Sequence, residues 1–179
     1  TNAGNPIPEV FTQVEINAPW QETLSQNREI YTGQPNEIAW ADSDFQWVRQ
    51  IPLRTRGIMV ENMYVNEFGG QRAPNAGLGY DIIDGERRIE VKLSSRTYAN
   101  NGNAYQWNQI RPDDDYTHLF LLGIDLNSVR AFFMTKEIGE QHSVAQHGGE
   151  DDTRMLITGD ADPVPAWLLD CEVFPNQAQ

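Results

Sequence analysis

The chain has 179 residues, of which 39% are hydrophobic and 22% charged, a composition typical of a single globular domain and unlike that of a disordered chain. Its 26 acidic and 13 basic residues give a net charge of −13, and Lys92 and Lys136 are its only lysines. A single cysteine excludes an internal disulfide and a cysteine-based zinc site. No apolar run reaches the ~18 residues that span a bilayer, and the first residues lack the basic start and apolar core of a signal peptide. We therefore expect a soluble, cytoplasmic protein without membrane contact.

The N-terminal third predicts an extended arm followed by helices. Residues 1–20 are rich in proline, asparagine and glutamine, which favours the arm, and residues 19–31 are compatible with a helix. Residues 56–68 form a stronger helical pattern, with Ile58, Val65 and Phe68 on one face and two glycines to end it. Glu61 falls on the same face. Either this carboxylate has a partner, because burying it alone would be costly, or the helix is rotated and Glu61 is solvated.

The segment from residue 79 to residue 95 predicts a β-hairpin, because Asp84–Gly85 separates two β-type runs. A two-residue turn there would set Asp81 opposite Arg88 and diagonal to Glu90, whereas a four-residue turn would set Asp81 opposite Glu90. Side chains repeat every two residues along a strand. Either even-length turn therefore places Asp81, Glu90 and Lys92 on one face of the hairpin.

The C-terminal half predicts further strands and one short helix. Residues 116–125 read as a buried strand, 128–136 as another, 136–146 as a short helix and 154–159 as one more strand, whereas 104–115 is ambiguous. This order of elements predicts an α/β or α+β fold, in which a mixed β-sheet is flanked by helices. We expect one domain over residues 1–179.

The acids and the lysine of the hairpin form a pattern with a chemical use. Paired carboxylates such as Asp81 and Glu90 are hard oxygen ligands for Mg²⁺, and the Val91 carbonyl would add a third. A bound metal polarises a phosphate and lowers the pKa of a bound water, while Lys92 would orient that water or balance developing charge. Glu61 would reach the metal directly or through water. The alternative is an ordinary solvated charged face.

At these positions the chain resembles the PD-(D/E)XK nuclease superfamily, whose signature is an acid in one strand and (D/E)-x-K in the next. Asp81 and Glu90–Val91–Lys92 match this signature, Glu61 matches the helical glutamate that often precedes it, and Tyr80 stands where the family carries a proline. The resemblance covers about residues 56–140. It implies a restriction-endonuclease-like core over about residues 54–140 and a Mg²⁺-dependent DNA endonuclease, most simply a type II restriction enzyme, in which Mn²⁺ substitutes for Mg²⁺.

The resemblance also implies double-stranded DNA as the partner. A double-strand cutter of this size is expected to be a homodimer, with residues 1–53 and 141–179 supplying recognition or dimer contacts. Two rival functions remain: a repair nuclease or junction resolvase on the same fold, and a non-catalytic acidic protein of the DNA-mimic or immunity type.

Several polar side chains near the hairpin are candidates for DNA contact. The segment 54–96 holds six of the eleven arginines and is close to neutral, in contrast to the rest of the chain. Ser94 and Ser95 would contact phosphate or simply end a strand, and Gln109 would read a base or belong to a polar loop. The DNA-binding candidates are Arg88, Ser94, Ser95, Arg96 and Gln109. His142 and His147 are five residues apart, which does not suit a helical metal site, so we assign them no role.

Overall fold

Two β-sheets and several helices make up the fold, in a computed structural model that describes residues 13–26, 38–75, 77–98, 105–149, 152–159 and 164–175. In chain order the elements are α1 (Gln13–Gln26), the 3₁₀ helix η1 (Ile38–Trp40), α2 (Gln46–Arg49), α3 (Leu53–Phe68), β1 (Gln71–Arg72), β2 (Ile82–Asp84), β3 (Arg87–Ser95), β4 (Gln106–Ile110), β5 (His118–Ile124), β6 (Val129–Thr135), α4 (Lys136–His142), β7 (Val144–Ala145), β8 (Arg154–Ile157), α5 (Ala166–Leu169) and β9 (Glu172–Val173). Within these ranges, no helix is long and apolar enough to cross a bilayer.

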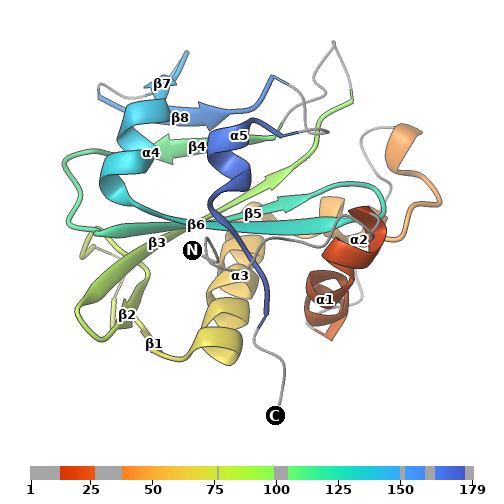
Figure 1. The fold of residues 1–179 in the computed structure, drawn as a ribbon, viewed down its shortest axis with the longest axis horizontal. Coiled ribbons are helices and arrows are strands. Elements are labelled where there is room, and N and C mark those ends of the chain that lie inside the picture. Colours follow the sequence, from red (N-terminus) through yellow and green to blue (C-terminus); the bar gives the residue numbers. More distant parts are fainter. Residues whose placement is uncertain are drawn as a thin grey trace.

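The larger sheet, sheet A, has the strand order β1-β2-β3-β5-β6-β9. Strands β3 and β5 are parallel and every other pair is antiparallel, which confirms the predicted mixed sheet. A parallel pair needs a long crossover connection. Here the crossover leaves β3, forms β4 in the second sheet and returns to β5 (Figure 1).

Sheet A is covered on both faces. Alternate residues of β5 enter different clusters: Phe120 and Leu122 pack on the α3 side, while Leu119 and Leu121 pack on the opposite side. Ile89 of β3 lies on the α3 side with them. A strand that is buried on both faces has no polar positions, and this is why residues 118–124 form an almost continuous apolar run.

Helix α3 lies beneath β3 and confirms the helix predicted over residues 56–68, with three more residues at its start. The predicted core face of Ile58, Val65 and Phe68 is only partly right: Val65 and Phe68 pack half-buried against the core, whereas the fully buried side chains are Met59, Val60, Met63 and Tyr64. Apolar residues occur around most of this helix, so periodicity alone did not select a face. Contact with the sheet made the selection, and the helix is rotated from the predicted orientation.

The predicted N-terminal arm is wrong over residues 13–20, which belong to helix α1; residues 1–12 lie outside the described part of the chain. Trp20 and Leu24 are four residues apart and fully buried. The Trp20 indole N–H donates to the carbonyl oxygen of Val173 at 2.7 Å. Burial of this helical face outweighs the local cost of Pro19, which lacks an N–H donor.

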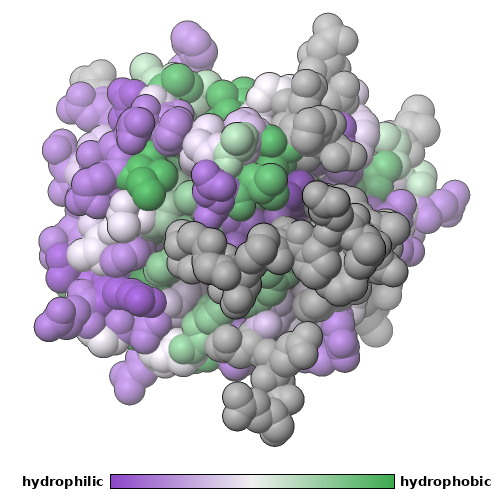
Figure 2. Space-filling model, viewed as in Figure 1, coloured by the Kyte–Doolittle hydropathy of each residue, from purple (hydrophilic) through white to green (hydrophobic). Residues whose placement is uncertain are grey.

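The second sheet, sheet B, is antiparallel with the order β4-β8-β7 and lies over the face of sheet A opposite α3 (Figure 1). Its β4 resolves the ambiguous segment 104–115, and β8 confirms the strand predicted near 154–159. Helix α4 confirms the short helix, shortened to residue 142, and Thr135 caps it by accepting the N–H of Ile138. Hydrophilic side chains cover much of the left of the surface in Figure 2, with smaller hydrophobic areas between them.

Candidate active site

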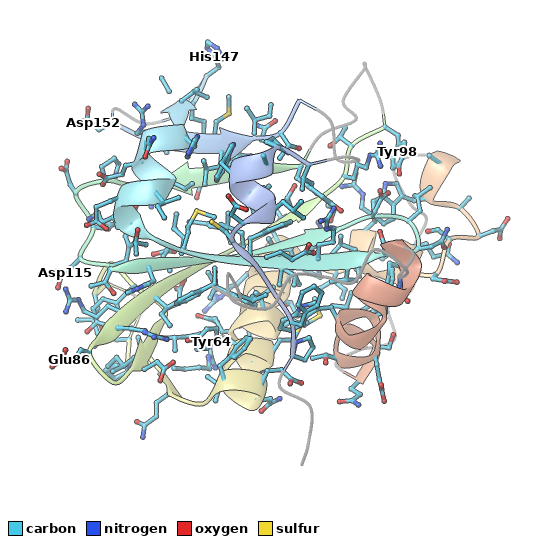
Figure 3. All side chains as sticks on the ribbon, viewed as in Figure 1. Tyr64, Glu86, Tyr98, Asp115, His147 and Asp152 are labelled. Carbon is cyan, nitrogen blue, oxygen red and sulfur yellow. The ribbon has the colours of Figure 1, made fainter. Side chains whose placement is uncertain are left out.

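The hairpin of β2 and β3 is present, with its turn one residue later than predicted. Asp84 pairs with Arg87, so Gly85 and Glu86 form the turn, and Gly85 supplies the positive φ of 63° that such turns require. The register continues toward a pairing of Asp81 with Glu90, and the Asp81 N–H donates to the Ile89 carbonyl at 2.8 Å. This is the arrangement in which Asp81 lies opposite Glu90. Figure 3 shows Glu86, in the turn, at the same side of the molecule as Asp115.

The Asp81 carboxylate hydrogen-bonds to the backbone of β3, as a neighbouring strand would. Its Oδ2 accepts the backbone N–H of Val91 at 2.9 Å. In a β-strand, the N–H and C=O of one residue project toward the same edge. The Val91 carbonyl therefore lies at the edge that Asp81 occupies, which is where a metal ligand from this residue would be needed.

Glu90 and Lys92 project from β3 on the sheet B side. Their strand neighbours on β5 are Leu119 and Leu121, which pack on that side. Lys92 Nζ lies 3.3 Å from Glu90 Oε1, and the two side chains are 18% and 15% exposed. The pKa of Glu90 is raised to about 8, because burial outweighs the opposing effect of Lys92 and the repulsion from Asp81 adds to the rise. The single ammonium group of Lys92 therefore does not offset the effect of burial on the Glu90 carboxyl.

Glu61 reaches the same edge from below, on α3. Its side chain is 13% exposed, so it is not solvated, and Arg72 of β1 donates to it at 3.2 Å. Burial raises the pKa of Glu61, the neighbouring Asp81 raises it further, and Arg72 lowers it. The ion pair of Glu61 with Arg72 bears out the alternative in which this carboxylate has a partner. Arg72 was missed from the sequence, because nothing local links it to an acid eleven residues upstream.

The structure thus gathers Glu61, Asp81, Glu90 and Lys92, with Asp81 at the strand edge in contact with acids from both faces of sheet A. Among the described residues, no group of three or more His, Cys, Asp or Glu side chains is arranged to hold a metal ion. Asp81, Glu90 and the Val91 carbonyl are the groups at this edge that could hold a Mg²⁺ ion, which would keep several waters.

A buried phenol also borders Glu90. Tyr116 is 3% exposed, and its hydroxyl has no hydrogen-bond partner within the described ranges. Burial and the surrounding acids, Glu90 among them, raise the pKa of this phenol, so it stays a neutral donor. No local pattern in the sequence singles out this residue, which precedes β5 and is buried by packing.

The five predicted DNA-binding residues are placed very differently. Ser94 is 5% exposed, with its Oγ accepting the Gln106 N–H, and the Ser95 hydroxyl is buried. Arg96 is held by Asp125 at 2.6 Å, and Arg88 donates to the Asp115 carbonyl while remaining partly exposed. Gln109 is exposed on β4. Burial therefore favours a structural role for Ser94 and Ser95, and leaves Arg88 and Gln109 accessible.

His118, His142 and the second lysine serve packing. His142 stacks on Trp167 with ring centroids 4.0 Å apart, and His118 stacks on Phe133. Lys136 Nζ donates to the Asp114 carbonyl and lies over a tyrosine ring. Between the two lysines of the chain, only Lys92 is paired with a carboxylate in the candidate site.

No protein-family model matches this chain, and no curated protein matches it significantly. The resemblance to PD-(D/E)XK nucleases stays a prediction.

Proposed function

We propose that this protein is a Mg²⁺-dependent DNA endonuclease with a restriction-endonuclease-like core. The observation that carries the proposal is the meeting of Asp81, Glu90 and Lys92 at one strand edge, with the pKa of Glu90 raised to about 8. Buried carboxylates that exceed the available positive charge are destabilising unless a cation joins them. A purely structural cluster would gain nothing from this excess.

Each residue of the site has a distinct role in phosphodiester hydrolysis. Mg²⁺ held by Asp81, Glu90 and the Val91 carbonyl would polarise the scissile phosphate and lower the pKa of a bound water. Lys92, with three N–H donors, orients the attacking water and balances the negative charge that develops on the phosphate. Glu61 accepts a hydrogen bond from a water at the same edge and so fixes its position.

A restriction-type enzyme is the form of this activity that we favour. One site cuts one strand, so cleavage of both strands calls for two copies of the chain, and a symmetric homodimer is the simplest arrangement. A repair nuclease or junction resolvase would use the same residues on branched DNA. The convergence of Asp81, Glu90 and Lys92 favours either nuclease over a non-catalytic DNA mimic, which has no need of a lysine among its acids.

The deciding experiment incubates the protein with a mixed-sequence plasmid and Mg²⁺, Mn²⁺ or EDTA, and then sequences the ends. We expect discrete fragments with either metal and none with EDTA. Asp81→Asn is the matched variant, because the amide oxygen still accepts the Val91 N–H while the charge is lost. Cleavage that persists in EDTA or in Asp81→Asn would overturn the proposal, and cutting of four-way junctions but not of linear DNA would favour the resolvase.

A further inference from the structure

The outer face of sheet B carries uncharged side chains from all three of its strands. Register places Gln106 beside Ile157 and Val144 beside Met155, and the Gln106 amide donates to Asn108 at 2.8 Å. Gln106, Asn108, Val144 and Ile157 are exposed. We call these side chains, together with Met155 and Gln109, the amide face.

A β-bulge in β4 gives this face two adjacent exposed amides. The pairing with β8 shifts between Trp107 and Ile110, which are both fully buried. In a regular strand a single exposed residue separates two buried ones. The bulge places two exposed residues, Asn108 and Gln109, between the buried Trp107 and Ile110. Gln109 has a φ of 57°, which is costly for a non-glycine residue, and its N–H is held by the Gln146 side chain at 2.6 Å. Bulges of this kind re-aim side chains beside active sites.

The amide face is fixed to the catalytic strand. Ser94 follows Lys92 by two residues on the same side of β3, and its Oγ accepts the Gln106 N–H at 2.8 Å. The Trp107 indole N–H donates to the Leu122 carbonyl of sheet A at 2.9 Å. These two bonds hold the start of β4 in a set position relative to Lys92.

We propose that the amide face reads A·T base pairs in the major groove of duplex DNA, an inference that rests on the proposed nuclease function. Asn and Gln amides match the donor and acceptor on the adenine edge, and apolar side chains such as Val144 and Ile157 match the thymine methyl group. The six described side chains of the amide face include no carboxylate, so they avoid the repulsion that the net charge of −13 creates elsewhere. Its link to β3 through Ser94 favours DNA, the partner of the proposed nuclease site, over a protein partner.

The test selects bound duplexes from a randomised DNA library with the Lys92→Ala protein and Mg²⁺, so that binding is measured without cleavage. We expect a selected sequence that contains A·T pairs. On the same background, Asn108→Ala and Gln109→Gly should each lower the discrimination at one A·T position by about 10- to 100-fold, with affinity for unrelated duplex unchanged. Gln109→Gly removes the amide while suiting the positive φ, and a thermal melt verifies that each variant folds.

Gln141→Ala, at an exposed glutamine of α4, is the matched control and should keep the full preference. An unchanged preference in both amide variants, or no sequence preference in the parent protein, overturns the inference. The inference is also overturned if the protein is a dimer that Ile157→Asp dissociates, because the amide face would then be a protein interface. If the wild type cleaves plasmid but the variants keep the full base preference, only this inference is contradicted. If the protein binds DNA selectively but never cleaves it, only the proposed function is contradicted.

Discussion

Two ion pairs of sheet A, Arg130–Glu172 and Lys92–Glu90, differ in how completely their charges are matched. Arg130 of β6 meets Glu172 of β9 through two hydrogen bonds of 2.9 and 2.8 Å, and the side chains are 5% and 2% exposed. Lys92 meets Glu90 at one contact of 3.3 Å, with greater exposure and with a second acid, Asp81, beside it. The first pair joins two strands. The second joins two positions of the same strand and so adds no link between strands.

The difference separates a structural pair from a site that needs a ligand. A bidentate guanidinium satisfies both oxygens of a carboxylate, and the charge is balanced. At the hairpin the carboxyls outnumber the ammonium, and burial raises the pKa of Glu90 to about 8. A divalent cation would remove that imbalance, which is the physical basis for placing Mg²⁺ there.

The largest effect is expected from Lys92→Ala, which should lower DNA cleavage by about 10³-fold or more, equivalent to about 4 kcal/mol of transition-state stabilisation. Unfolding in urea should change little, because Lys92 links no other element. Lys136→Ala is the matched control, since it removes the other lysine, and it should cleave at nearly the wild-type rate. Equal losses of cleavage in the two variants would contradict the role of Lys92.

Breaking the structural pair should mainly affect stability. Arg130→Met leaves the Glu172 carboxylate buried and unpaired, so the free energy of unfolding should fall by about 3–5 kcal/mol in urea titrations. The double variant Arg130→Met/Glu172→Met should regain most of this loss, because no buried charge is left. If the single variant is as stable as the wild type, the pair is not the buried, matched contact described above.

Glu90→Gln should stabilise the metal-free protein at alkaline pH. The folded-state pKa of Glu90, about 8, is above its unfolded value near 4.3. The associated stability is therefore complete below about pH 4.3 and is lost as the pH rises through 8. Glutamine does not ionise. At pH 8.5 the free energy of unfolding of the variant should therefore be about 1–3 kcal/mol higher than that of the wild type, as measured by urea titrations at several pH values.

Mg²⁺ provides the internal control for this result. The cation should raise the melting temperature of the wild type at pH 8.5, because it binds the ionised carboxylates of the folded state, and raise that of Glu90→Gln much less. A gain of equal size in both proteins would place the bound cation elsewhere.

The smallest effect is expected at Arg72, which is 47% exposed where it pairs with Glu61. Arg72→Ala should change the free energy of unfolding by less than about 1 kcal/mol, as exposed pairs usually do. Arg72 lowers the pKa of Glu61, so its removal should raise that pKa, which a carbon-13 NMR titration of the carboxyl group would detect. A fall in the pKa would contradict the contact.

Much of the site could be predicted from local pattern. The hairpin, its alternation and the Glu90–Val91–Lys92 spacing depend on the two-residue period of a strand, so Glu90 and Lys92 share a face in any register. The turn position was one residue off, because Gly85 serves at the first turn position rather than the second. The arm predicted over residues 13–20 was wrong and the face of α3 was only partly right, because tertiary burial of Trp20 and Met63 decided both.

The sequence by itself determined the elements whose geometry is repeated along the backbone: the apolar run of β5, the charged positions of β3 and the helix that carries Glu61. Tertiary structure alone decided that Asp81 takes the Val91 N–H, that Glu61 arrives from the other side of the sheet to contact Asp81, and that Ser94 is buried against β4. Periodicity is a property of one segment, whereas these contacts join segments that meet only when both faces of sheet A are packed. The excess of acid over base, visible in the composition as −13, becomes a specific site only through that packing.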